Sequence, residues 1–134
     1  MPRFSVWSLR AALLHLGLGF TLGALMLSAP ALHLPATIVR LRPLHVESLL
    51  VGWMVQLALG VAYWILPRLR GRPTRGSERL AWISLLLLNV GVLAVGVGQM
   101  IGAPAGVPLA GRAAETMAAL GFARHAWPRA RRAY

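Results

Sequence analysis

The chain has 134 residues, of which 57% are hydrophobic and 13% are charged. A soluble domain of this size carries about twice that charged fraction, so the composition favours a single membrane domain. All 14 basic residues are arginine, and they flank apolar runs instead of forming one basic face, which argues against nucleic-acid binding despite the net charge of +11. The absence of cysteine excludes disulfides, thiolate metal sites and covalent c-type heme attachment.

Apolar runs predict an all-α, integral membrane four-helix bundle with helices at about 8–29, 44–67, 78–101 and 107–127. The run at 11–29 is longer than the apolar core of a signal peptide, so we expect it to remain as the first helix. The run at 48–66 has 19 uncharged residues, which span roughly 28 Å as a helix. Pro104 and Pro108 divide a further uncharged run at 80–111 into two elements.

The fourth predicted helix carries charge, which makes its insertion the hardest to predict. Arg112 and Glu115 are three residues apart and can pair on one helix face, which lowers the cost of placing them in lipid. The distribution of arginine also favours four spans. With both termini in the cytoplasm, 11 of the 14 arginines lie on the cytoplasmic side, as the positive-inside tendency requires. Those of the loop at 68–79 are part of that set.

A polar seam runs along the second predicted helix. Steps of three and four residues from His45 place Gly52, Gln56 and Tyr63 on one face, while the other faces are aliphatic. Polar side chains within a membrane turn toward protein or a ligand. The seam therefore predicts a partner helix or a cofactor beside this face.

The same stretch carries a family resemblance. Its Arg42-x-x-His45, Gly52-Trp53, Gln56, Gly60-x-Ala62-Tyr63 and Pro67-Arg68 resemble the second transmembrane helix of subunit I in the heme-copper oxidase and nitric-oxide reductase superfamily, particularly the cbb-type oxidases and short stand-alone proteins that keep only this part of the fold. The resemblance implies that His45 is an axial ligand of a low-spin heme. Many of the short relatives read H-x-H here, whereas this chain has Glu47 in place of the second imidazole.

A heme b requires one or two axial histidine or methionine side chains and room for the macrocycle. The predicted topology puts His45 in the outer half, with Met26, Met100 or the His45 of a second protomer as the opposite ligand. Gly52 would leave space beside the ring, and Gln56 would line the same seam. The alternative is an inner site that pairs His15 with His125. Each of these residues also has a plainer interpretation, as an interfacial, packing or hydrogen-bonding side chain.

The sequence excludes oxygen or nitric-oxide reduction by this chain alone. The superfamily's chemistry uses six histidines, and the chain has four. Our first hypothesis is therefore a multi-pass protein of the bacterial cytoplasmic membrane that binds heme b through His45 and serves a respiratory complex, as a homodimer or within a larger assembly. The second is a cofactor-free structural or assembly subunit that packs against other membrane helices. A third, weaker hypothesis is an ion pathway charged by Arg112 and Glu115.

Overall fold

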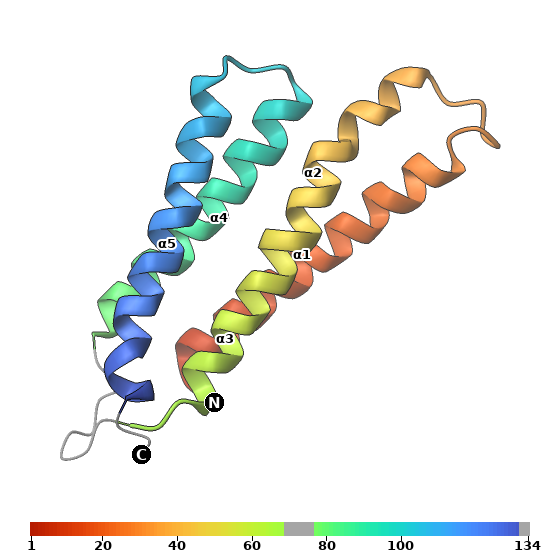
Figure 1. Ribbon diagram of the computed structural model, residues 1–134. Helices are drawn as coiled ribbons and strands as arrows, with labels where there is room; N and C mark the ends of the chain where they lie inside the picture. The colour runs from red at the N-terminus through yellow and green to blue at the C-terminus, as the bar shows by residue number, and fades with distance from the viewer. Residues whose placement is uncertain (69–76, 132–134) are drawn as a thin grey trace.

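The computed structural model describes residues 1–68 and 77–131. Its helices, in chain order, are α1 (Arg3–Ser28), a continuous second helix made of η1 (Ala36–Leu41), α2 (Arg42–Glu47), η2 (Ser48–Val55) and α3 (Gln56–Ile65), then α4 (Glu78–Met100) and α5 (Gly106–Ala130) (Figure 1). The described residues contain no strand, so the predicted all-α fold with four long helices is confirmed. Four arginines of the predicted cytoplasmic set, at positions 70, 72, 75 and 132, lie outside the described residues.

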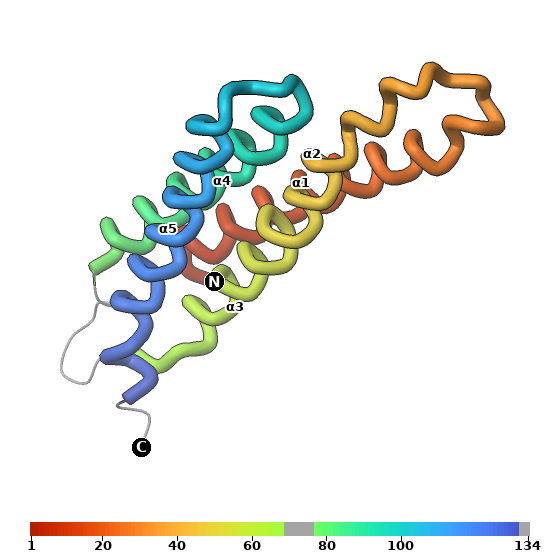
Figure 2. Tube along the Cα trace, turned by 45° about the horizontal axis from the view of Figure 1, so that its top comes forward, coloured from red at the N-terminus to blue at the C-terminus, as the bar shows by residue number. Residues whose placement is uncertain are grey.

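The bundle consists of two helical hairpins. α1 packs antiparallel to the second helix, and α4 packs antiparallel to α5 (Figures 1 and 2). The hairpins meet where α2 and η2 lie against α4. The second helix therefore contacts α1 along α2, η2 and α3, and contacts α4 along α2 and η2, so its polar seam faces protein.

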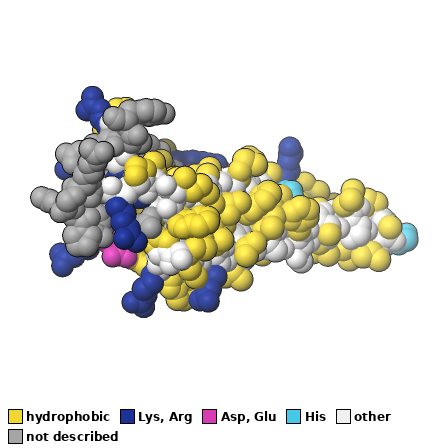
Figure 3. All heavy atoms as spheres, turned by 90° about the horizontal axis from the view of Figure 1, so that it is seen from below, with side chains coloured by type: hydrophobic (Ala, Val, Ile, Leu, Met, Phe, Trp, Pro, Cys, Tyr) yellow, Lys and Arg dark blue, Asp and Glu magenta, His cyan; other side chains and the backbone are white. Residues whose placement is uncertain are grey.

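Three helices are long and apolar enough to cross a membrane, namely Arg3–Ser28, Ala36–Ile65 and Glu78–Met100. Their outward faces expose large aliphatic side chains such as Leu14 and Leu27, as expected for contact with lipid. Seen from below, hydrophobic side chains cover most of the molecule and arginines appear mainly toward one end (Figure 3). α5 is the fourth long helix and contains Arg112 and Glu115 among its apolar residues.

Glycines set the close approach of α4 and α5. A Cβ at Gly91 would lie 2.8 Å from the carbonyl oxygen of Gly111, and a Cβ at Gly111 would lie 3.0 Å from that of Gly91. Helix backbones come this near only where side chains are absent. Gly98 and Gly102 are four residues apart, a spacing that also allows close packing of membrane helices. Gly98 does face α5, whereas Gly102 has φ +68° and follows the end of α4, where a left-handed residue is usual.

Three helix ends differ from the predicted bounds. The second helix begins at Ala36 instead of about 44, because η1 continues directly into α2. The other two differ for one shared reason. α1 begins at Arg3 instead of about 8, and α5 continues to Ala130 past Pro128. Both ends pack against the last turn of α3, since the Phe4 and Tyr63 ring centroids are 4.5 Å apart and Arg129 reaches the carbonyl groups there. Tertiary contacts thus extend helices that the local sequence alone would end earlier.

Candidate functional site

His45 is turned toward the neighbouring helix α1. Its Nδ1 lies 2.7 Å from the carbonyl oxygen of Gly19. Because a carbonyl oxygen only accepts, Nδ1 carries the proton and donates, which leaves Nε2 with its lone pair when the ring is neutral. The hydrogen bonds of the described residues do not use Nε2. The imidazole is therefore held in one orientation with one ligating nitrogen available.

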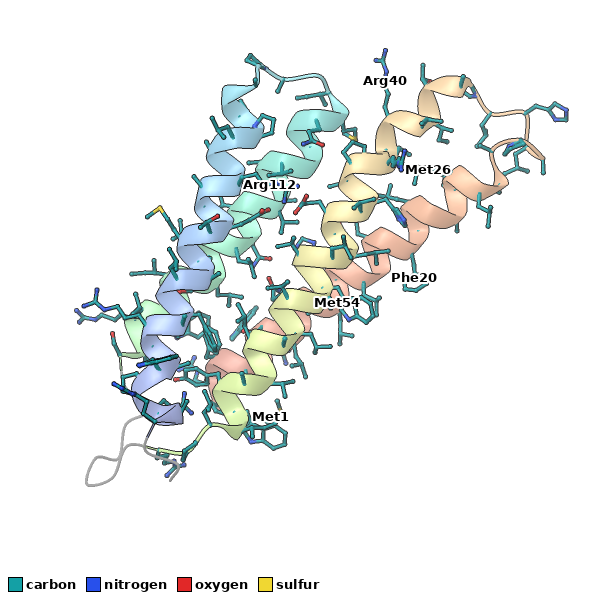
Figure 4. The ribbon with its side chains drawn as sticks, viewed as in Figure 1. Met1, Phe20, Met26, Arg40, Met54 and Arg112 are labelled. Carbon is teal, nitrogen blue, oxygen red and sulfur yellow. The ribbon has the colours of Figure 1, made fainter. Side chains whose placement is uncertain are left out.

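Glycines on α1 make room for this ring. A Cβ at Gly23 would lie 2.6 Å from Cε1 of His45, and a Cβ at Gly19 would lie 2.5 Å from the side chain of Leu49. Met26 follows Gly23 by three residues, so it lies on the same face of α1, and Figure 4 shows it between α1 and the outer part of α2. Met100, the other predicted thioether, is the last residue of α4.

His15 belongs to a different group, a chain of hydrogen bonds across three helices. Its Nε2 lies 3.0 Å from Oδ1 of Asn89, and Asn89 donates through Nδ2 to Oε1 of Gln56 at 2.9 Å. Gln56 in turn donates to the backbone oxygen of Ser8 at 3.4 Å. These hydrogen bonds give Gln56, in the polar seam of the second helix, partners on α1 and α4, as its spacing predicts.

The space at Gly52 is filled by protein. A Cβ at this position would lie 2.5 Å from Cγ and 2.6 Å from Nδ1 of His15. The sequence predicts a slot for a cofactor ring beside Gly52, but the slot holds the imidazole of His15. Gly52 lies within the π-helical segment η2, whose wider turns change which residues face α1 relative to a regular α-helix.

His125 lies at the other end of the bundle in an aromatic and cationic cluster. Its ring stacks on Tyr63 at 5.2 Å between centroids, and its two nitrogens lie 3.1 Å from the Ser77 carbonyl oxygen and 3.3 Å from Nη1 of Arg129. The carbonyl fixes Nδ1 as donor, so Nε2 accepts from Arg129. Both nitrogens of His125 are therefore used. The structure does not bring His125 together with His15, its partner in the predicted inner site, because the two imidazoles belong to separate clusters.

Arg129 was not predicted from the sequence, although it is 1% exposed. It donates through Nε to the backbone carbonyl oxygen of Pro67 at 3.0 Å, and through Nη2 to that of Tyr63 at 2.9 Å. Nη2 also donates to the backbone carbonyl oxygen of Leu66. These carbonyl groups end α3 and have no further helical turn to bond, so the guanidinium acts as a C-cap from another helix. The i to i+4 spacing of His125 and Arg129 was the available signal.

A second unpredicted partner is Glu47, which joins the predicted pair on α5. Arg112 donates to Glu115 at 2.9 Å, and to both oxygens of Glu47 at 2.9 and 2.6 Å (Figure 4). Glu47 and Glu115 are 4% and 9% exposed. The ion pairs join α5 to α2 across the two hairpins. The signal in the sequence was that Glu47, one of only three acids, falls inside a predicted membrane helix, where it requires a partner.

The residues near His45 fit a b-type heme in one respect. An imidazole oriented by a backbone carbonyl through Nδ1, with Nε2 available, is the usual arrangement of a metal-binding histidine. The other three histidines lack this arrangement. The second ring nitrogen of His15 lies against Gly52, and His125 uses both of its ring nitrogens in hydrogen bonds. His33 lies in the exposed connection after α1. No group of three or more His, Cys, Asp or Glu side chains suited to a metal ion occurs in the described parts of the chain.

A family model described as cytochrome c and quinol oxidase polypeptide I matches residues 3–127, nearly the whole chain. Comparisons with curated proteins and with solved structures give no match.

Proposed function

The chain belongs to the cytochrome c and quinol oxidase polypeptide I family, and from this premise we propose that it is a heme-b-binding subunit of a respiratory membrane complex. We place it in the bacterial cytoplasmic membrane with four spans, α5 being the fourth, and with both termini in the cytoplasm. Eleven arginines then lie on the cytoplasmic side, and His45 lies in the outer half.

The observation that carries the proposal is the hydrogen bond from Nδ1 of His45 to Gly19. It keeps the ring against α1 and directs Nε2 away from that bond, as an axial ligand requires. A heme b bound there would pass single electrons between a donor and an acceptor. His45 would hold the iron, and Gly19 would fix the orientation and tautomer of His45.

The second axial ligand would come from Met26 or from another chain, including the His45 of a second protomer. His15 and His125 are bonded within their own clusters, which supports a second ligand other than these two histidines. Met100 is the less favoured thioether, because it ends α4, whereas Met26 shares the face of α1 that carries Gly23.

The test is the heme content of the full chain, expressed with heme supplied and purified in mild detergent. We expect Soret and α-band absorbance in the wild type, its loss by at least about tenfold in His45→Ala, and its retention in His125→Ala. Met26→Leu would shift the bands if Met26 is the second ligand and leave them unchanged if another chain provides it. Bands that persist in His45→Ala would refute the assignment.

One observation favours the second candidate, a cofactor-free structural or assembly subunit. Glu47 stands where many of the short proteins that the chain resembles carry a second imidazole, and here it binds Arg112 through both oxygens. That position serves the contact between the hairpins. A wild-type protein that takes up no heme, even when hemin is added to the folded chain, would support this candidate.

A further inference from the structure

Glu47, Arg112 and Glu115 form a charged cluster that the heme proposal does not use. The cluster lies between the two hairpins, with Glu47 on α2 and the other two on α5. It contains two acids and one base. If all three groups were ionised, the cluster would carry one unbalanced negative charge in the interior of a membrane protein, where unpaired charges are strongly disfavoured.

The two carboxyl groups are bonded unequally. Glu47 receives a separate N–H on each oxygen from the two ends of the guanidinium, the fork geometry that best suits an ionised carboxylate. Glu115 receives one N–H on Oε2, from the same Nη1 that serves Glu47. Its other oxygen, Oε1, is buried and has no hydrogen-bond partner. The unbalanced charge would therefore fall on Glu115.

No other charged group compensates Glu115 from the helices around it. α4 has no charged side chain after Arg79, which lies at its far end. The α4 residue that packs against Glu115 is Gly91, where a Cβ would lie 2.6 Å from the Cγ of Glu115. α2 contributes Glu47, while its exposed Arg42 lies at the start of that helix and His45 faces α1. On α5 the facing group is Arg112, already bonded to Glu47.

We propose that Glu115 is a proton-binding site, which holds one exchangeable proton on Oε1 at neutral pH. Protonation converts the carboxylate to a neutral acid, so that Arg112 and Glu47 balance each other and the cluster carries no net charge. A neutral carboxyl group is far less costly to bury than a carboxylate with an unpaired oxygen. The side chain of Arg112, which bonds Oε2 of the same carboxyl group, is 50% exposed.

The chain is well suited to a direct test, because it has only three acidic side chains, Glu47, Glu78 and Glu115. Infrared spectra of the purified full chain, in H2O and in D2O at neutral pH, report a protonated carboxyl group through its C=O stretch and the isotope shift of that band. We expect the band in the wild type, its absence in Glu115→Gln, and its retention in Glu78→Gln. The C-terminal carboxyl is ionised at this pH and does not contribute.

Thermal unfolding of the glutamine variants locates the proton. Glutamine resembles a neutral acid, so Glu115→Gln should leave the unfolding midpoint near that of the wild type. Glu47→Gln should lower it, because an amide NH2 would face the N–H groups of Arg112. The proposal is overturned if the wild type shows no protonated carboxyl at neutral pH, if the band survives in Glu115→Gln, or if Glu115→Gln is the more destabilised of the two. Heme content does not enter these measurements, so failure of the heme proposal would leave this one standing.

Discussion

The two ends of the bundle differ in how completely their ionisable side chains are bonded. At the end that holds the termini, Arg129, His125 and Tyr63 lock α5 onto the end of α3, and the nitrogens of His125 are both used. In the other half, His45 has an unused Nε2, and Glu115 has a buried oxygen without a partner. Buried hydroxyl groups without a partner occur toward the terminal end as well, at Ser5 and Ser8, so the contrast concerns ionisable side chains. An imidazole nitrogen or a carboxyl oxygen without a partner is where a ligand or a proton would bind.

The difference teaches that residue type alone does not identify a site in this chain. Histidine occurs in both halves, yet one imidazole serves as a link in a structural cluster and the other keeps a free ligating nitrogen. The following substitutions test whether the first end is structural and the second functional. They are ordered from the largest expected loss of stability to the smallest.

Arg129→Ala should be the most destabilising change. It leaves the carbonyl groups of Tyr63, Leu66 and Pro67 without their donor and removes a fully buried side chain, so we expect a loss of about 3 kcal/mol or more in the free energy of unfolding. The measurement is denaturant or thermal unfolding in detergent, followed by circular dichroism. Arg124→Ala, an exposed arginine on the same helix, is the control and should stay close to the wild type. Equal losses in the two variants would show that Arg129 is not a structural cap.

Gly52→Ala tests the close contact between His15 and the second helix. The added Cβ would lie 2.5 Å from the imidazole of His15, so either the ring or the helix must shift. We expect a loss of about 2 kcal/mol from this overpacking. Gly17→Ala is the matched control, because a Cβ there has no neighbour within 4 Å. A wild-type midpoint in Gly52→Ala would instead mean that the space beside Gly52 is open, as a cofactor slot would be.

The fold was largely predictable because membrane helices follow from the length of apolar runs. The runs on either side of Pro30, and the division at Pro104, indicate all four long helices, although the second begins before Pro43, at Ala36. The helix ends near Arg3 and Ala130 were not predictable, since they depend on contacts with the end of α3. No local signal reports such a contact.

The candidate site was predictable only where its partners lie on one helix. The pair of Arg112 and Glu115 follows from a spacing of three residues. The contacts of His15 with Gly52, and of Glu47 with Arg112, depend on the rotation of one helix relative to another, which the π-helical turns of η2 change further. Arg129 resembles its exposed neighbours in sequence, and only the position of α3 distinguishes it.

Asn89→Ala addresses the hydrogen bonds between the two ends. It removes the acceptor of His15 and the donor to Gln56, both of which are then left in the interior. Hydrogen bonds between membrane helices contribute less than their burial suggests, so we expect a loss of about 1 kcal/mol. Gln99→Ala, an exposed amide on the same helix, should have no measurable effect. If both variants unfold like the wild type, the polar chain does not stabilise the bundle.

His45→Ala, measured on the heme-free protein, should have the smallest effect of the four. Its side chain makes one hydrogen bond, to the carbonyl of Gly19, and is only half-buried. A carbonyl within a helix keeps its intrahelical donor when that bond is lost, so no buried group is orphaned and the expected loss is below about 1 kcal/mol. His125→Ala, whose ring is buried and bonded through both nitrogens, should lose about 2 kcal/mol in the same unfolding assay. The reverse order would make His45 the structural link between helices and His125 the dispensable ring, and the contrast between the two ends would no longer hold.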